Sequence, residues 1–320
     1  MNDLIRLDSY AIHTTLKILL RDKTTGKNII WATNNYANRG VEYQDRSEIT
    51  VGSLKGLNSI EIQPRVLKSK EMQKTRTKSK AEVFTPSWLC NLMNNSCDEQ
   101  WFDRKDVFNT MDENNNWVAK RGRIGFSKNK GKTWKDYVDS RRIEITCGEA
   151  PYLVSRYDTT TGEIIDIRKR IGILDRKLRV VSENTKTEEE WFEWVVRAYQ
   201  STYGYEYQGD SLLIARMNLI LTFSDYAKHK WGKEPSEAQL KKIAKIISWN
   251  LWQMDGLTCE VPLGGPVIIE PVQMTIDDIL KKKRKRKTGT EEKLYVKIRN
   301  WRNGTSTHTI YFKDIREENK

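Results

Sequence analysis

Histidine and cysteine are scarce in this sequence of 320 residues, which limits the metal and redox chemistry that it can support. The three histidines are widely separated, which argues against a histidine-built metal site and a histidine-centred catalytic triad (His13, His229 and His308). The four cysteines show no C-x-x-C or other close spacing (Cys90, Cys97, Cys147 and Cys259). This pattern predicts a reduced, cytoplasmic protein, and we expect no metal.

Long apolar runs are also absent. No stretch approaches the ~18 apolar residues that a membrane-spanning helix needs, so no membrane partner is expected. Charged residues at the N-terminus argue against a secretory signal (Asp3, Arg6, Asp8 and Lys17). Aromatic residues, by contrast, make up 10% of the sequence, which is typical of a chain with a packed core rather than of a disordered one. The length predicts one main domain with additions.

Basic residues exceed acidic ones, and the formal net charge is +13 at pH 7. One run supplies seven of the positive charges: Lys281, Lys282, Lys283, Arg284, Lys285, Arg286 and Lys287. A basic surplus is typical of proteins that bind nucleic acids, so this run predicts contact with DNA. The alternative interpretation is a solvated, disordered linker. The two interpretations are compatible, because such a linker can still lie along phosphates.

Composition and patterning divide the sequence into three parts without internal repeats. Residues 1–78 are predicted to form an N-terminal module with a helix over Tyr10–Leu20. Residues 79–260 hold the strongest secondary-structure patterns. Residues 261–320 combine a basic linker with a small hairpin, whose tight turn is predicted at Asn303-Gly304.

Short strands and amphipathic helices alternate in the central part. The predicted strands are Arg142–Thr146, Tyr203–Tyr207 and Trp249–Met254. The predicted helices are Ile171–Asn184, Thr187–Thr202, Asp210–Tyr226 and Ser236–Ser248. Strands that alternate with helices predict an α/β fold with a parallel sheet.

The carboxyl ends of these strands carry residues suited to a ligand, which in open α/β sheets binds at that edge. Glu144 is followed by a turn that contains Gly148, where the backbone can approach a ligand closely. Glu206 ends the second strand and can accept hydrogen bonds from a ribose diol. Asp255 follows the third strand and suits recognition of an adenine amino group. A strand-end acid can also be a simple cap or turn residue, and the order of the three on one βαβαβ unit favours a ligand site.

Residues 63–260 resemble the N6-adenine DNA methyltransferases of restriction–modification systems. The segment Ala81–Pro86 (AEVFTP) is similar to the one that precedes the core in that family, and Ile143–Gly148 stands where the family has its first motif for S-adenosylmethionine (AdoMet). The segments Tyr205–Leu219 and Asn250–Gly256 look like the second and third motifs. The first motif departs from the family pattern, because Glu149 and Ala150 replace a small residue and a glycine.

The resemblance implies a Rossmann-like, class I methyltransferase sheet and assigns roles toward AdoMet. Glu144 or Thr146, together with Gly148, would line the methionine end, Glu206 would hold the ribose hydroxyls, and Asp255 would lie near the adenine. Phe84, Thr85 and Pro86 would close the pocket. The structural alternative for Phe84 and Pro86 is packing at the entry of a helix, where proline is common.

The family's catalytic motif, NPPY or a near variant, has no counterpart, because the sequence contains no Pro-Pro dipeptide. In the family this motif binds the target amine and stacks on the flipped adenine. The family sheet has the order 3-2-1-4-5, and this sequence supplies only strands 3-2-1. An unpaired strand edge is an association site. The resemblance, together with the missing motif, therefore implies an adenine-specific DNA methyltransferase that is active only with a second subunit, which supplies the catalytic motif and target recognition. We expect the C-terminal hairpin to dock onto that partner, and a restriction subunit is a further possible partner.

Two other interpretations stay open. The first is a catalytically inactive, methyltransferase-like protein that binds DNA or a partner in an anti-restriction or regulatory role. The second is a nuclease or DNA-binding activity carried by residues 1–78, where no catalytic constellation is visible. The affinity for AdoMet separates the first alternative from the split enzyme.

Overall fold

The computed structural model describes residues 4–70, 73, 77, 85–126, 131–265, 293–302 and 308–318. The helices of these segments are α1 (Tyr10–Leu19), α2 (Val51–Lys55), α4 (Ser87–Phe102), α5 (Trp134–Asp139), α6 (Ile173–Asn184), α7 (Glu188–Gln200), α8 (Gly209–Trp231), α9 (Glu237–Asn250) and α11 (Phe312–Glu318). The strands are β1 (Asn109–Met111), β2 (Trp117–Ala119), β3 (Arg142–Glu144), β4 (Thr202–Glu206), β5 (Leu251–Gln253), β6 (Lys297–Asn300) and β7 (His308–Tyr311).

The central sheet is open and parallel, with the order β3-β4-β5. In its register, Glu144 lies beside Gly204, and Gly204 lies beside Leu251. The chain passes from β3 to β4 through α6 and α7, and from β4 to β5 through α8 and α9. This confirms the predicted α/β class and the parallel pairing of the three strands. Two antiparallel pairs, β1-β2 and β6-β7, complete the described strands.

Local sequence signals explain where the crossover helices begin. Thr187 caps α7 by accepting a hydrogen bond from the N–H of Glu190 at 3.2 Å. Ser236 and Gln239 form a capping box at the start of α9. The starts of α7 and α9 agree with the sequence prediction. Each cap is formed by residues only three positions apart, so it can be recognised in the sequence.

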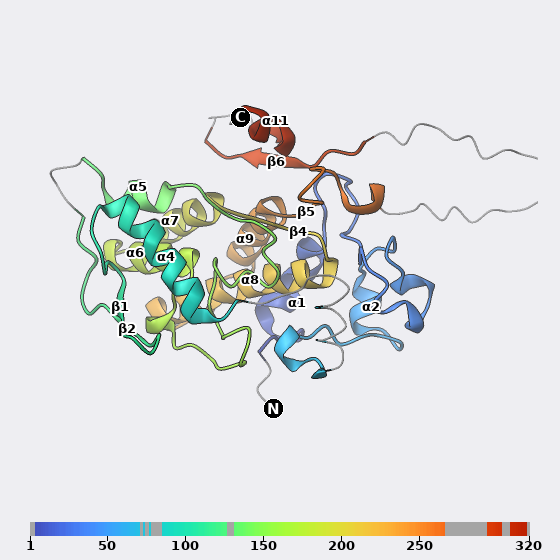
Figure 1. Cartoon of the computed structure of the whole chain (residues 1–320), viewed down its shortest axis with the longest axis horizontal. Coiled ribbons are helices and arrows are strands. Elements are labelled where there is room, and N and C mark those ends of the chain that lie inside the picture. The colour runs from blue at the N-terminus through green and yellow to red at the C-terminus, as the bar shows by residue number, and fades with distance from the viewer. Residues whose placement is uncertain are drawn as a thin grey trace, which may run out of the picture.

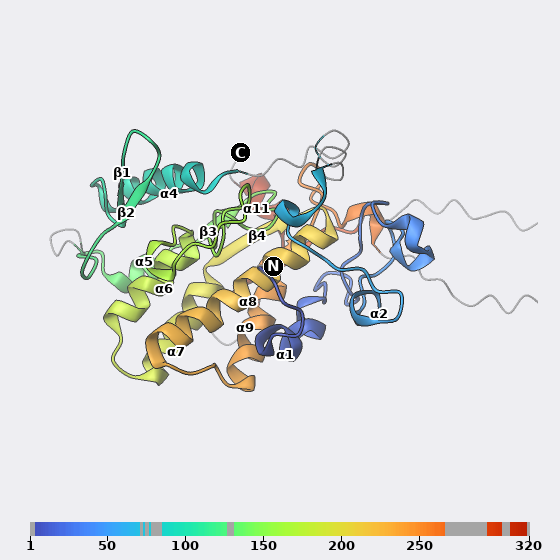
Figure 2. The same ribbon diagram turned by 90° about the horizontal axis from the view of Figure 1, so that it is seen from below.

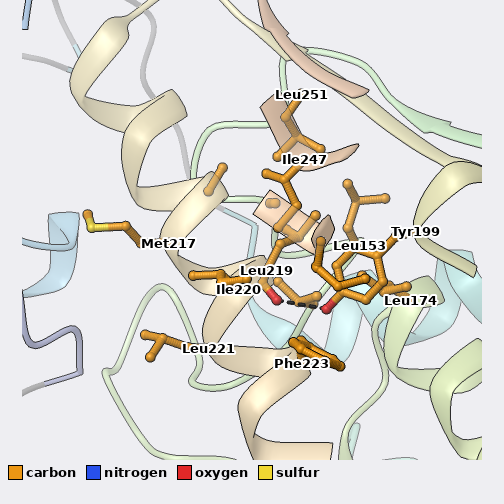
Figure 3. Packing of buried hydrophobic residues seen from close by; sticks show 14 of the residues in the cluster. Leu153, Leu174, Tyr199, Met217, Leu219, Ile220, Leu221, Phe223, Ile247 and Leu251 are labelled. Carbon is orange, nitrogen blue, oxygen red and sulfur yellow. Dashed lines mark hydrogen bonds between the residues drawn. The ribbon is translucent and has the colours of Figure 1, made fainter. Parts of the chain in front are cut away.

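Helix α8 is the centre of the main core rather than a helix with one solvent-facing side. Of its 23 residues, 18 are buried, because it contacts α1, α6, α9, β4 and β5. Figure 3 shows Leu219 and Phe223 of this helix packed near Tyr199 of α7 and Leu174 of α6. The hydroxyl of Tyr199 donates a hydrogen bond of 2.8 Å to the carbonyl of Leu219. The helix thus fixes the end of β4 that precedes it.

The N-terminal segment belongs to the same core. Helix α1 packs against α8 and α9 (Figure 2), and its apolar side chains join the core cluster. The side-chain amide of Gln253 exchanges two hydrogen bonds with the backbone of Ile30, at 2.8 and 2.9 Å. The predicted boundary at residue 78 lies outside the described residues, and the segments on either side of it share one hydrophobic core.

The C-terminal hairpin covers the other face of the sheet. Side chains of β6 and α11 pack against Tyr205 of β4 and Trp252 of β5 in a second apolar cluster. The indole of Trp301 donates a hydrogen bond of 2.8 Å to Asn250. The hairpin therefore packs on its own sheet (Figure 1), and its docking onto a partner stays a prediction. Its second strand ends at Tyr311, where α11 begins. The predicted turn at Asn303-Gly304 lies outside the described residues.

The outer edge of β3 is open. Within the described segments, β3 pairs with β4 alone. Ile143 and Ile145 are 45% and 65% exposed beside that edge. This agrees with the expectation of an unpaired edge next to uncovered apolar surface. In the described part of the chain, no helix combines the length and the apolar character needed to cross a membrane.

Candidate functional site

A cavity of about 690 Å³ opens at the carboxyl ends of β3 and β4. Its walls come from β3 and the turn after it, from the end of β4 and the start of α8, and from α4 and α6. The lining residues are Thr85, Met93, Asn94, Cys97, Ile143, Glu144, Ile145, Thr146, Cys147, Gly148, Pro151, Tyr152, Ile173, Glu206, Tyr207, Gln208 and Ser211. The volume lies within the range of small-molecule sites, which is roughly 300–1,000 Å³.

The turn after β3 has an unusual backbone. Thr146, Gly148 and Ala150 have φ angles of 45°, 53° and 65°. Such angles are uncommon for residues other than glycine and often occur at binding sites. Two hydrogen bonds hold the turn against the end of β4, from the N–H of Cys147 to the carbonyl of Tyr205 at 2.8 Å and from the N–H of Gly148 to Glu206 at 2.9 Å.

Glu206 joins the two strand ends. One carboxylate oxygen accepts the N–H of Gly148, and the other accepts the N–H of Gln208 at 3.0 Å. Burial raises the pKa of Glu206, and the N–H bonds from Gln208 and Gly148 act in the opposite direction. A carboxylate oxygen can accept two hydrogen bonds. The backbone N–H of Tyr207 is a third donor to this carboxylate, so one acceptor position of Glu206 remains for a ligand in the cavity.

Glu144 is the second acid in the wall. It accepts the N–H groups of Tyr152 and Leu153 at 3.3 and 3.1 Å. Burial raises its pKa well above the usual value, despite these two bonds, and the nearby charge of Glu206 adds to the increase. Among the described residues, those that line the cavity include no lysine or arginine. A cationic or hydroxyl-bearing ligand would stabilise these buried carboxylates, whereas a phosphate would be repelled.

Five of the eight residues predicted to bind a cofactor line this cavity: Thr85, Glu144, Thr146, Gly148 and Glu206. Pro86 stands at the start of α4 and does not line the cavity. Asp255 also lies outside the wall, near Tyr207. Its carboxylate accepts the N–H groups of Leu257 and Thr258 at 2.8 and 3.3 Å, as in a turn. Phe84 lies outside the described residues, and so does the basic run Lys281, Lys282, Lys283, Arg284, Lys285, Arg286 and Lys287.

The two residues that depart from the family's first motif, Glu149 and Ala150, lie outside the cavity wall. Glu149 is buried away from the cavity, where it accepts the N–H of Arg65 at 2.6 Å and the hydroxyl of Tyr157 at 2.7 Å. Ala150 has the left-handed φ that favours glycine. Neither side chain lines the cavity, so neither replacement fills the space in which a ligand would bind.

Helix α4 supplies a wall that the sequence patterns did not indicate. Its Met93, Asn94 and Cys97 line the cavity, although they precede β3 by about fifty positions in the sequence. Asn94 donates to the carbonyls of Tyr152 and Ile171, each at 3.0 Å, and so binds the helix to the region that follows the turn. Such contacts depend on the tertiary fold and leave no local signal.

The start of α4 is held by a second element. Asp158 accepts the N–H of Ser87 at 2.7 Å, and the hydroxyl of Thr159 donates to the carbonyl of Thr85 at 3.1 Å. Desolvation opposes ionisation of Asp158, but hydrogen bonds from Thr160 and Ser87 lower its pKa to about 2. The ionised Asp158 therefore positions Thr85 at the edge of the cavity.

Tyr207, Gln208 and Ser211 are further wall residues that sequence reasoning missed. Tyr207 and Gln208 directly follow Glu206, and Ser211 is in the first turn of α8, so their place after a strand end was the signal that could have identified them.

Comparisons with protein-family models, with curated proteins and with solved structures give no match. Within the described ranges, no group of three or more His, Cys, Asp and Glu side chains is arranged to hold a metal ion.

Proposed function

We propose that this chain is the AdoMet-binding subunit of an adenine-specific (N6) DNA methyltransferase that acts with a second subunit. The observation that carries the proposal is the cavity at the ends of β3 and β4. It contains Thr85, Glu144, Thr146, Gly148 and Glu206, which are the residues that the family resemblance assigns to AdoMet. The parallel order of β3, β4 and β5 is consistent with the 3-2-1 half of a methyltransferase sheet.

The chemistry of the wall fits AdoMet. Glu206 can accept a further hydrogen bond beside those from Gly148, Gln208 and Tyr207, which suits a hydroxyl of a ribose. The acidic wall suits the positive charge of a sulfonium. The strained turn at Gly148 allows the backbone to approach the ligand closely. AdoMet, when bound, would supply the methyl group for transfer, and these residues would bind and orient it.

The second subunit would supply what this sequence lacks. No Pro-Pro dipeptide occurs in it, so an NPPY motif must come from elsewhere. The open edge of β3, with Ile143 and Ile145 exposed beside it, is a suitable place for a strand from that subunit. In this arrangement the catalytic residues would lie next to the cavity that holds the methyl donor.

The absence of the catalytic motif also favours a second candidate function, a methyltransferase-like protein that binds DNA or a partner without catalysis. A methyl-transfer assay separates the two. The chain is purified alone and together with the product of the adjacent reading frame, and transfer of a labelled methyl group from AdoMet to DNA adenine is measured in both preparations. The proposed function predicts transfer only in the joint preparation.

Loss of that transfer in a folded Glu206→Gln variant would link it to this cavity. Transfer by the chain alone would contradict the split enzyme. Absence of transfer in both preparations, together with no binding of AdoMet, would support the non-catalytic function.

A further inference from the structure

A second basic segment, separate from the run at Lys281–Lys287, lies in the middle of the sequence. Residues 114–135 contain seven lysines and arginines and no aspartate or glutamate. Five of these basic residues are described in the structure, and all five are exposed: Lys120, Arg121, Arg123, Lys132 and Lys135. We call the surface that they form the 120–135 surface. It lies at the end of the molecule that holds β1, β2 and α5 (Figure 1).

The fold brings the two halves of this surface together. Residues 120–126 lie against α6, whose Arg179 donates to the carbonyls of Lys120 and Gly122 at 2.7 and 3.1 Å. The N–H of Ile124 donates to Glu183 at 2.8 Å. Residues 131–134 line the same hollow of about 520 Å³ as residues 123–126. Arg123 and Lys132 therefore line one concave region, and Lys120, Arg121 and Lys135 lie next to its lining segments in the sequence.

The positive charge of this surface is not neutralised locally. In the described segments, none of its five basic side chains forms an ion pair with a carboxylate (Lys120, Arg121, Arg123, Lys132 and Lys135). Two nearby acids have other partners. Glu183 pairs with Arg179 at 2.7 Å, and Asp136 accepts the N–H and the hydroxyl of Thr133, each at 2.7 Å. An unpaired cluster of cations attracts a polyanion.

Aromatic rings are interleaved with the cations. Phe126 and Trp134 line the hollow. The ammonium of Lys132 lies 4.9 Å from the ring centre of Trp101, and that of Lys135 lies 5.7 Å from the ring centre of Trp134. Lysine and arginine side chains contact the phosphates of nucleic acids through their charge, and the half-buried rings of Phe126 and Trp134 form part of the wall of the hollow beside them.

We propose that the 120–135 surface binds the phosphate backbone of duplex DNA. The choice of DNA as the partner rests on the proposed function. The 120–135 surface would hold the DNA substrate outside the cofactor cavity. Charge complementarity selects the partner, because five exposed cations without paired carboxylates match a regular array of phosphates. An anionic membrane is the competing polyanion and is an outcome of the test.

Two triple variants of the full chain test this proposal. The first replaces Lys120, Lys132 and Lys135 by glutamine. The matched control replaces three exposed lysines of α1 and α9 by glutamine (Lys17, Lys242 and Lys245). These helices lie on the opposite side of the molecule from β1 and β2 (Figure 2). Each variant removes three charges from a net charge of +13, so the two differ only in where the charge is lost.

Binding of a fluorescent DNA duplex is measured by anisotropy over a range of salt concentrations, without AdoMet. The 120–135 variant should bind about tenfold more weakly or worse. Its plot of log K against log salt should be shallower by about 2 to 3, since each phosphate contact contributes about 0.9 to the slope. The control should bind within about twofold of the wild-type chain.

Equal loss in both variants, or no loss in the 120–135 variant, would overturn the proposal. Binding of vesicles that contain phosphatidylserine, without binding of DNA, would also overturn it. AdoMet binding by the same variants provides a separate readout. If AdoMet binding fails while the DNA results hold, the proposed cofactor function is wrong and the DNA surface stands.

Discussion

Replacing Glu206 by glutamine is the sharpest perturbation of the candidate cofactor site. The substitution keeps the size of the side chain but changes one oxygen into an amide donor. Both oxygens of Glu206 accept a backbone N–H, from Gly148 and from Gln208. In the variant, one of these buried N–H groups faces an N–H₂ group and loses its acceptor. The free energy of unfolding should fall by about 1–3 kcal/mol, the cost of a buried donor without a partner.

The same change weakens or removes the acceptor that Glu206 would offer to a ribose hydroxyl. A hydrogen bond to a charged group contributes about 1.5–3 kcal/mol. The affinity for AdoMet should therefore fall by about 10- to 150-fold. Isothermal titration calorimetry measures this loss, and urea unfolding measures the stability of the same sample, which separates weak binding from loss of the fold.

Glu183→Gln is the matched control. Glu183 also accepts a backbone N–H, from Ile124 at 2.8 Å, but it does not line the cavity. This variant should lose stability and keep its AdoMet affinity within about twofold. If folded Glu206→Gln bound AdoMet as tightly as the wild-type chain, the assignment of the ribose to this carboxylate would be refuted.

Two further predictions concern stability. Asp158 has a pKa of about 2 in the folded chain, below the unfolded value of about 3.9. Its contribution to the free energy of unfolding is therefore fully present above about pH 3.9 and is lost as the pH falls toward 2. Asp158→Asn should lower the free energy of unfolding by about 1 kcal/mol at pH 7, after allowance for solvent screening, and by less at pH 3. Urea unfolding at both pH values checks this, and a difference that grew at pH 3 would contradict it. A Cβ atom at Gly209 would lie 1.9 Å from the carbonyl oxygen of Ile30, so Gly209→Ala should destabilise the chain by about 3 kcal/mol. Gly125→Ala, where a Cβ atom meets nothing within 4 Å, should change the melting temperature little, and equal effects of the two substitutions would show that the clash is absent.

Elements that depend on local signals could be predicted from the sequence. The caps at Thr187 and Ser236 and the apolar spacing that follows them mark α7 and α9. The strands that these helices connect are then predicted to form a parallel sheet, because helical crossover connections between successive strands favour parallel pairing around a shared core. Glu144, Gly148 and Glu206 came together because the carboxyl ends of parallel strands meet at one edge.

Features that depend on tertiary contacts could not be predicted in this way. Asn94 reaches the cavity region through hydrogen bonds to residues that follow 58 and 77 positions later. The hairpin covers Tyr205 and Trp252, although its own sequence shows only weak alternation. Asp255 follows β5 as expected, but the turn after the strand directs its carboxylate to Leu257 and Thr258. In each case a long-range contact or a turn determines where the residue lies. Neither of these produces a periodic pattern in the sequence.

Equilibrium dialysis of labelled AdoMet against the wild-type chain tests the central claim most directly. The cavity predicts saturable binding of one AdoMet per chain, and S-adenosylhomocysteine should displace it, since both ligands share the ribose that Glu206 would hold. A folded chain that shows no saturable binding of AdoMet would contradict the assignment of the cavity at the ends of β3 and β4 as a cofactor site.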